Sequence, residues 1–271
     1  MSEAPMEVPR RHLGLVFVHG AGKEPSGYYR GFLAALATAL GAEPSYLAAW
    51  RADLCDLGPA VKAGPAAAPR LTREAEEFRQ AYLLALGMGV DGQHERGAQS
   101  PVRSVGGTLI SLTDTVNDVV QYFYNPSMRS AIQLRLHERL AEAAGAFDHT
   151  LLVSHSLGTV IAYDVLRQKA SDYNIHTWFT TGSPLAKLAQ LGQVTKDVGQ
   201  IARGGISAWH NLFDPGDVVA SALSTCFAFP LKDVIVENGA GILNSHNYWG
   251  NSAVAGLVAE AVKRRYLRLP L

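Results

Sequence analysis

Short apolar runs alternate along most of the chain with longer stretches in which apolar residues recur every three or four positions. The run LGLVFV at 13–18 stops at His-Gly, and this length and stop are typical of a buried strand. Strands are predicted at 13–18, 45–50, 150–153, 176–181, 206–213 and 231–236. Helices are predicted at 26–40, 74–89, 108–125, 128–145, 157–170, 185–201 and 248–265. The alternation predicts an α/β fold with a mostly parallel central sheet and helices on both faces.

The regular alternation is interrupted between residues 51 and 125. The stretch KAGPAAAPR at 62–70 is typical of a linker, and the residues at 91–107 have the composition of a loop. The helices predicted at 74–89 and 108–125 lie on either side of that loop. We therefore expect one domain over residues 1–271, in which 51–125 is inserted as a helical cap or lid.

Both helices of the predicted cap have an apolar stripe at helical spacing. The first stripe consists of Phe78, Tyr82, Leu83, Leu86 and Met88, and the second of Val116, Val119, Val120, Phe123 and Tyr124. Stripes of this kind usually pack onto the body of the protein. The alternative is that part of this surface lines an acyl pocket and opens as a lid.

Charge and composition exclude several classes of function. The 24 basic residues equal the 24 acidic residues, so the charge favours neither nucleic acid nor an anionic membrane as a partner. The first residues lack the apolar stretch of a signal peptide, and no apolar run approaches the roughly 20 residues of a spanning helix. Cys55 and Cys226 are not in a metal-ligand spacing. We expect reduced cysteines in a cytoplasmic protein; the alternative is one disulfide in an exported protein.

The stretch LLVSHSLGTV at 151–160 places a serine where a predicted strand meets a predicted helix. Ser154-His155-Ser156-Leu157-Gly158 matches the nucleophile-elbow pattern, with Ser154 in place of the first glycine. Residues two positions from the nucleophile must be small, because strand and helix approach each other closely. The elbow places Ser156 at a helix N-terminus, where free N–H groups favour an oxyanion.

An activated serine needs a base, and the base needs an acid that orients it. The turn after the strand at 206–213 offers Asp214 and Asp217, and the loop before the last helix offers His246. Both lie where parallel strands end, which is where open α/β sheets bind their ligands. Either aspartate could be the acid, and Asp214 could instead cap its turn. His155 is expected to point away from Ser156.

With these motifs the chain resembles the α/β-hydrolase superfamily, and most closely its lipase and esterase branches. In those enzymes an aspartate before two apolar residues and a loop histidine shortly before Tyr-Trp complete a catalytic triad. The resemblance implies that Ser156 is the nucleophile, Asp217 the acid and His246 the base. It extends from residue 13 to the last helix but not over 51–125. A cap at that place departs from the commoner arrangement, in which the cap follows the strand after the nucleophile helix.

The same resemblance implies an oxyanion hole made of two backbone N–H groups. One belongs to Leu157, and the family supplies the other from the turn after the first strand, here His-Gly-Ala-Gly at 19–22. Ala21 is the expected donor and Gly22 the next, unless these glycines serve only the geometry of the turn. A phosphate-binding loop is excluded because no Gly-Lys-Ser/Thr follows. Gly182-Ser183-Pro184 resembles a lipase turn that lines the pocket, and we assign it no catalytic role.

The sequence therefore predicts a serine hydrolase that cleaves a carboxylic ester through an acyl-enzyme. Its partner is a small-molecule ester or acyl substrate, without nucleic acid, stable membrane insertion, metal or organic cofactor. A thioesterase or an acyltransferase would use the same residues. A ligand-binding protein on a hydrolase scaffold is the alternative from another class. The sequence does not specify the acid and alcohol groups of the substrate or the oligomeric state.

Overall fold

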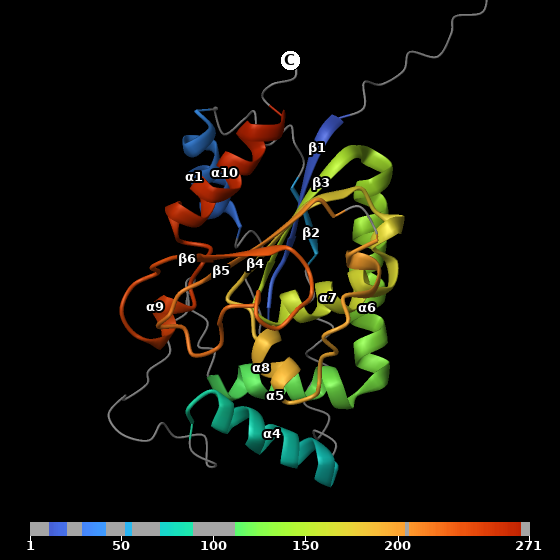
Figure 1. Cartoon of the computed structure of the whole chain (residues 1–271), viewed down its shortest axis with the longest axis vertical. Coiled ribbons are helices and arrows are strands. Elements are labelled where there is room, and N and C mark those ends of the chain that lie inside the picture. Colours follow the sequence, from blue (N-terminus) through green and yellow to red (C-terminus); the bar gives the residue numbers. More distant parts are fainter. Residues whose placement is uncertain are drawn as a thin grey trace, which may run out of the picture.

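The computed structural model describes residues 11–20, 29–41, 52–55, 71–88, 112–203 and 206–266. Its centre is a parallel sheet in the order β2-β1-β3-β4-β5-β6 (Figure 1). The strands are β1 (Arg11–Val18), β2 (Ala52–Cys55), β3 (Phe147–His155), β4 (Ile175–Thr181), β5 (Ala208–Phe213) and β6 (Leu231–Ile235). The predicted α/β fold with a parallel sheet is confirmed.

Helices cover both faces of this sheet. They are α1 (Arg30–Leu40), α4 (Arg73–Ala85), α5 (Leu112–Tyr124), α6 (Pro126–Ala146), α7 (Leu157–Lys169), α8 (Leu185–Gln190), α9 (Ile242–Ser245) and α10 (Ser252–Tyr266). In Figure 1, α1 and α10 lie together on one side of the sheet, and α6 and α7 lie on the other. No helix within the described ranges is both long enough and apolar enough to cross a bilayer.

The side chains of β1 point alternately into two hydrophobic cores, one on each face of the sheet. Leu13, Leu15 and Phe17 belong to the hydrophobic cluster that contains α1 and α10. Val16 and Val18 belong to the cluster on the opposite face, with α6 and α7. Successive side chains of a strand point to opposite faces, so a strand covered by helices on both sides must be apolar throughout. This explains the continuous apolar run that marked the strand in the sequence.

The strand order reverses between β1 and β3. The chain runs outward from β1 to β2 and then returns to the other side of β1 to form β3. In open α/β sheets, ligands bind where the strand order reverses in this way. Gly20 follows β1 and Ser156 follows β3, so both lie where the strand order reverses.

One predicted helix is shorter than expected. The single helix predicted at 185–201 is wrong, because α8 ends at Gln190 and only a 3-10 turn, Gly199–Ile201, follows. Gly192 and Gly199 have φ angles of 75° and 54°. These left-handed conformations interrupt the helical hydrogen-bond pattern, and glycine adopts them without steric cost.

The first crossover also differs in detail from the prediction. The strand predicted at 45–50 lies outside the described residues. Instead, β2 at 52–55 pairs in parallel with β1 and forms the end of the described sheet. The first four residues after Arg51 therefore belong to the sheet, although the sequence pattern grouped them with the cap. The predicted loop at 91–107 also lies outside the described residues.

Candidate functional site

Ser156 occupies a strained turn between β3 and α7. Its φ and ψ angles are 53° and −131°, and it is the one non-glycine residue with positive φ in the part of the chain that the structure describes. Such a conformation costs about 1–3 kcal/mol and persists only where the surroundings enforce it. Strain of this kind at a serine after a central strand is the geometry expected of a nucleophile elbow.

Small residues on both sides make this turn possible. A side chain at Gly158 would overlap the carbonyl oxygen of His19, and one at Gly20 would overlap the side chain of Ser156. Ser154, which stands where the pattern usually has glycine, is fully buried. Its hydroxyl accepts a hydrogen bond from Trp178 Nε1 at 2.8 Å and donates to a backbone carbonyl. A serine is therefore accommodated there because its hydroxyl is paired.

The turn is also anchored to the next strand. Ser156 N–H donates to the carbonyl of Thr181, the last residue of β4, at 3.0 Å. The Thr159 hydroxyl donates to Ser156 O at 2.7 Å and lies 2.8 Å from the Ser183 hydroxyl. Ser183 belongs to the Gly-Ser-Pro turn before α8, and its hydroxyl also accepts from Leu185 N–H. These contacts give the turn after β4 a structural part in holding the elbow.

Asp217 and His246 meet at the carboxyl ends of β5 and β6. His246 Nδ1 lies 2.8 Å from Asp217 Oδ2. The Asp217 side chain is completely buried, whereas 23% of the His246 side chain is exposed. A carboxylate can only accept a hydrogen bond, so Nδ1 carries a hydrogen, and in the neutral form of the ring Nε2 is the acceptor. This is the tautomer that a general base requires.

Two further donors hydrogen-bond to the same carboxylate. Tyr248 Oη donates to Asp217 Oδ2 at 2.9 Å, and Val219 N–H donates to Oδ1 at 2.9 Å. Burial alone would raise the pKa of the Asp217 carboxyl. The charge of His246 and the hydrogen bonds from His246, Val219 and Tyr248 outweigh that effect, and together they lower this pKa below its ordinary value. Asp217 is therefore held ionised beside the imidazole.

Asp214, the alternative acid, has other partners. Its Oδ1 accepts from Gly216 N–H at 2.7 Å, and its Oδ2 accepts from Asn238 N–H at 2.6 Å. Its own N–H donates to Tyr248 Oη at 2.8 Å. Both carboxylate oxygens are thus engaged with backbone groups, as expected of an aspartate that organises a turn. The structure brings Asp217, rather than Asp214, to His246.

Gly182 gives the His246 ring its place above the end of β4. Its φ is 59°, and an added Cβ would lie 2.8 Å from Tyr248 Cε2 and 3.0 Å from His246 Cε1. The His246 imidazole therefore lies over the end of β4. Strand β4 is the neighbour of β3 in the sheet, and β3 ends just before Ser156. Within the described residues, no hydrogen bond joins Ser156 to His246; such bonds often tighten only when substrate is bound.

His155 connects the turn at Ser156 to the candidate base, His246. Its Nε2 lies 3.1 Å from the backbone oxygen of His246, and the two ring centroids are 4.7 Å apart. The sequence left this residue without a role. The sequence pattern likewise includes Tyr248 only as part of a Tyr-Trp pair. Its position two residues after His246 could have indicated a contact with the acid.

The predicted oxyanion hole is described only in part. Leu157 is the first residue of α7, so its N–H belongs to the free end of that helix. Ala21 and Gly22 lie outside the described residues. The first half of their turn lies beside the elbow, since His19 O faces Gly158 and Gly20 faces Ser156.

The apolar stripe of α4 is buried, as the first alternative predicted. Its five residues, with Leu86 and Met88 just beyond the helix, belong to the same cluster as the buried residues of α7. Figure 1 shows α4 beside α5 and near α8, the helix that follows the Gly-Ser-Pro turn. Tyr82 is completely buried, and its hydroxyl has no hydrogen-bond partner among the described residues.

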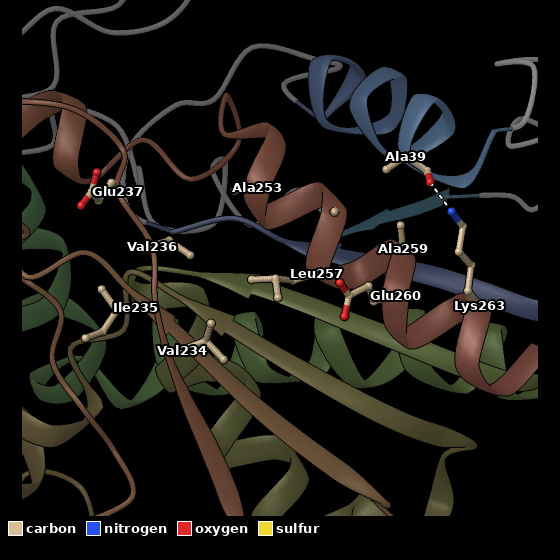
Figure 2. Close-up of a pocket in the computed structure, with 11 residues that line it drawn as sticks. Ala39, Val234, Ile235, Val236, Glu237, Ala253, Leu257, Ala259, Glu260 and Lys263 are labelled. Atoms are coloured by element: carbon tan, nitrogen blue, oxygen red, sulfur yellow. Dashed lines mark hydrogen bonds between the residues drawn. The ribbon is translucent and has the colours of Figure 1, made fainter.

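A separate hollow lies at the edge of the sheet. It is bounded by β6, by α10 and by the last turn of α1 (Figure 2). Lys263 Nζ lies at its rim and donates to Ala39 O at 2.6 Å, which satisfies a carbonyl at the end of α1. None of the candidate catalytic residues lines this hollow. Among the described residues, no group of three or more His, Cys, Asp or Glu side chains is arranged to hold a metal ion.

Comparison with known proteins adds little to this geometry. No protein-family model and no curated protein matches the chain. One similar solved structure is the phospholipase PlaB from Legionella pneumophila in complex with thio-NAD, with 12% sequence identity and a TM-score of 0.27. The match covers 78% of this chain and 41% of that phospholipase, so this chain spans less than half of its length. A likeness this weak carries no argument about function.

Proposed function

We propose that the protein is a serine hydrolase of the α/β-hydrolase type that cleaves carboxylic esters. The observation that carries the proposal is the strained Ser156 turn together with the hydrogen-bonded pair of buried Asp217 and partly exposed His246 at the same edge of the sheet. The three residues follow in the order serine, aspartate, histidine, which is the order of the α/β-hydrolase triad. Each of them comes after a different strand of one parallel sheet.

The proposed acylation begins at Ser156 Oγ. His246 Nε2 takes the hydroxyl proton while Oγ attacks the ester carbonyl carbon, and the carbonyl oxygen becomes an oxyanion. The ionised Asp217 stabilises the imidazolium that forms. The N–H groups of Leu157 and Ala21 are the proposed donors to the oxyanion. When the intermediate collapses, the carbon–oxygen bond to the alcohol breaks and His246 returns the proton to the leaving alkoxide.

Deacylation repeats these steps with water. His246 takes a proton from water, the hydroxide attacks the acyl-enzyme, and Ser156 leaves with the proton that His246 returns. A thioester would react through the same steps with a thiolate as leaving group. An acyltransferase would admit an alcohol or amine in place of water. The described residues supply no feature that favours one of these acceptors.

Hydrolysis of p-nitrophenyl esters of increasing chain length tests the proposal. Wild type should release p-nitrophenol, and Ser156→Ala and His246→Ala should each lower kcat by at least about 10³-fold. Ser171→Ala is a matched control, because its hydroxyl is exposed and bonded to Gln200. Binding of an ester without turnover by any variant would instead identify a ligand-binding protein. Faster release with added alcohol or amine would identify an acyltransferase.

A further inference from the structure

His155 is the last residue of β3 and precedes Ser156 in the sequence. Its side chain is 7% exposed and lies under the loop that carries the candidate base. Its ring centroid is 4.7 Å from that of His246, 5.7 Å from Tyr248 and 5.6 Å from Trp249. His155 is thus enclosed by three rings of one short segment, although 91 residues separate it from His246.

The hydrogen bond of His155 fixes its tautomer. Its Nε2 lies 3.1 Å from the backbone oxygen of His246. A carbonyl oxygen can only accept, so Nε2 must carry the hydrogen and Nδ1 is unprotonated. The ring is therefore a neutral donor to the main chain of the very residue whose side chain serves as the base.

The surroundings keep this ring neutral. Burial, followed by the neighbouring charge of His246, lowers the pKa of His155 from 6.5 to about 3. His19 also lowers this pKa, whereas Asp217 and the hydrogen bond to His246 act in the opposite direction. A neutral ring is required here, because a second cation beside His246 would oppose the imidazolium that forms during acylation.

Gly182 shows that the two imidazoles are packed together on one support. An added Cβ at this residue would lie 3.0 Å from His246 Cε1 and 3.2 Å from His155 Cδ2. The space between the end of β4 and both rings is therefore filled. A shift of the His155 ring would be passed on to the His246 ring.

We propose that His155 is a positioning residue that sets the distance between Ser156 Oγ and the His246 imidazole. It is covalently joined to Ser156 and hydrogen-bonded to the backbone of His246, so it links two residues between which the described part of the chain shows no direct hydrogen bond. The inference rests on the proposed function, because it assigns a role only if Ser156 and His246 react with each other.

Two substitutions separate the hydrogen bond from the packing. Glutamine in His155→Gln carries an N–H donor at about the reach of Nε2, whereas leucine in His155→Leu fills space without a donor. Active sites are counted by stoichiometric labelling with a fluorophosphonate, and kcat and KM for a p-nitrophenyl ester are expressed per labelled site. Thermal unfolding of each variant is measured alongside.

His155→Leu should lower kcat by about 10–100-fold with KM changed less than twofold, since a misplacement of the order of 1 Å can cost about 100-fold. His155→Gln should retain kcat within about fivefold. A purely structural role would lower the fraction of labelled sites or the unfolding temperature and leave kcat per site unchanged.

Three outcomes would count against the inference. Wild-type kcat per site in His155→Leu would overturn the positioning role alone, and so would equal losses of kcat in the leucine and glutamine variants. Folded wild-type protein that is neither labelled nor active would instead overturn the proposed function, and the positioning role with it.

Discussion

At the scale of single residues, the site depends on positions where a side chain would be in the way. Ser156 is held at positive φ, and glycines at 20 and 158 give the backbone room around it. Gly182 plays the same part for the base, because both imidazoles of the site rest against it. The absence of these side chains is therefore as much a part of the site as the presence of Asp217 and His246.

Gly182→Ala should damage catalysis more than stability. The substitution places an alanine at a backbone φ of 59° and puts its methyl group 3.0 Å from His246 Cε1. We expect a loss of stability of about 1–2 kcal/mol from the backbone strain and a fall in kcat of at least about tenfold from the displaced ring. The measurements are chemical unfolding and ester turnover.

Gly192→Ala is the matched control for this prediction. Gly192 has a φ of 75°, but an added Cβ would meet no atom within 4 Å. It should therefore show a similar loss of stability and wild-type kcat. Equal kcat in the two variants would contradict the account of the Gly182 position.

The two aspartates after β5 should differ in what they support. Asp217→Asn should lower kcat by about 10³–10⁴-fold, because an amide no longer holds the imidazole in its reactive tautomer. Asp214→Asn should keep kcat within about threefold and lose stability, because Asp214 serves the turn. The opposite order of kcat values would make Asp214 the acid.

The pKa of Asp217 adds a pH dependence to this comparison. Because the pKa of Asp217 is lower in the folded than in the unfolded chain, the folded state binds fewer protons at pH values between the two pKa values. Its contribution to stability is fully present above the ordinary aspartate pKa of about 3.9 and is lost as the pH falls through the folded-state value. The difference in unfolding free energy between wild type and Asp217→Asn should therefore shrink below about pH 4. A difference that grows toward acid pH would contradict the lowered pKa.

At the scale of elements, strands and most helices could be predicted because their patterns are local. The apolar run of β1 and the helical spacing of α6 depend on neighbours a few residues away. The end of α8 could not be placed, since Gly192 interrupts a stretch that is otherwise compatible with a helix. Strand β2 could not be predicted either. It has only four residues, and it is recognised as a strand by its pairing with β1.

Tyr82, in the apolar stripe of α4, buries a polar hydroxyl whose effect on stability can be measured. The Tyr82 hydroxyl is buried without a hydrogen-bond partner in the part of the chain that the structure describes, and an unpaired buried group costs about 1–3 kcal/mol of desolvation. Burial and then the charge of Asp217 raise the pKa of this hydroxyl, so it stays protonated. Tyr82→Phe should therefore leave the free energy of unfolding unchanged or raise it by up to about 2 kcal/mol.

Tyr122→Phe is the control for Tyr82→Phe. Tyr122 is equally buried, but its hydroxyl donates to Asp164 at 2.8 Å. That variant should be destabilised, because it removes a hydrogen bond to a partly buried carboxylate. If Tyr82→Phe were destabilised as much as Tyr122→Phe, the hydroxyl would have a partner in solution.

At the scale of the whole molecule, the sheet brings together residues that are far apart in the sequence. The order of the motifs and their positions after strands were enough to select Ser156, His246 and both aspartates as candidates for the triad. The choice between Asp217 and Asp214 required the fold, because both precede the same loop and differ only in which partners they reach. The role of His155 also required it, since its contact spans 91 residues. Ser154 in place of glycine is explained only by Trp178 on the next strand.

The central claim is that the fold activates Ser156 as a nucleophile. The most direct measurement is the intact mass of the protein after treatment with a fluorophosphonate, followed by mapping of the modified peptide. We predict one adduct on Ser156 in wild type, none in Ser156→Ala, and much slower labelling in His246→Ala. Labelling at another residue, or at the same rate without His246, would contradict the account.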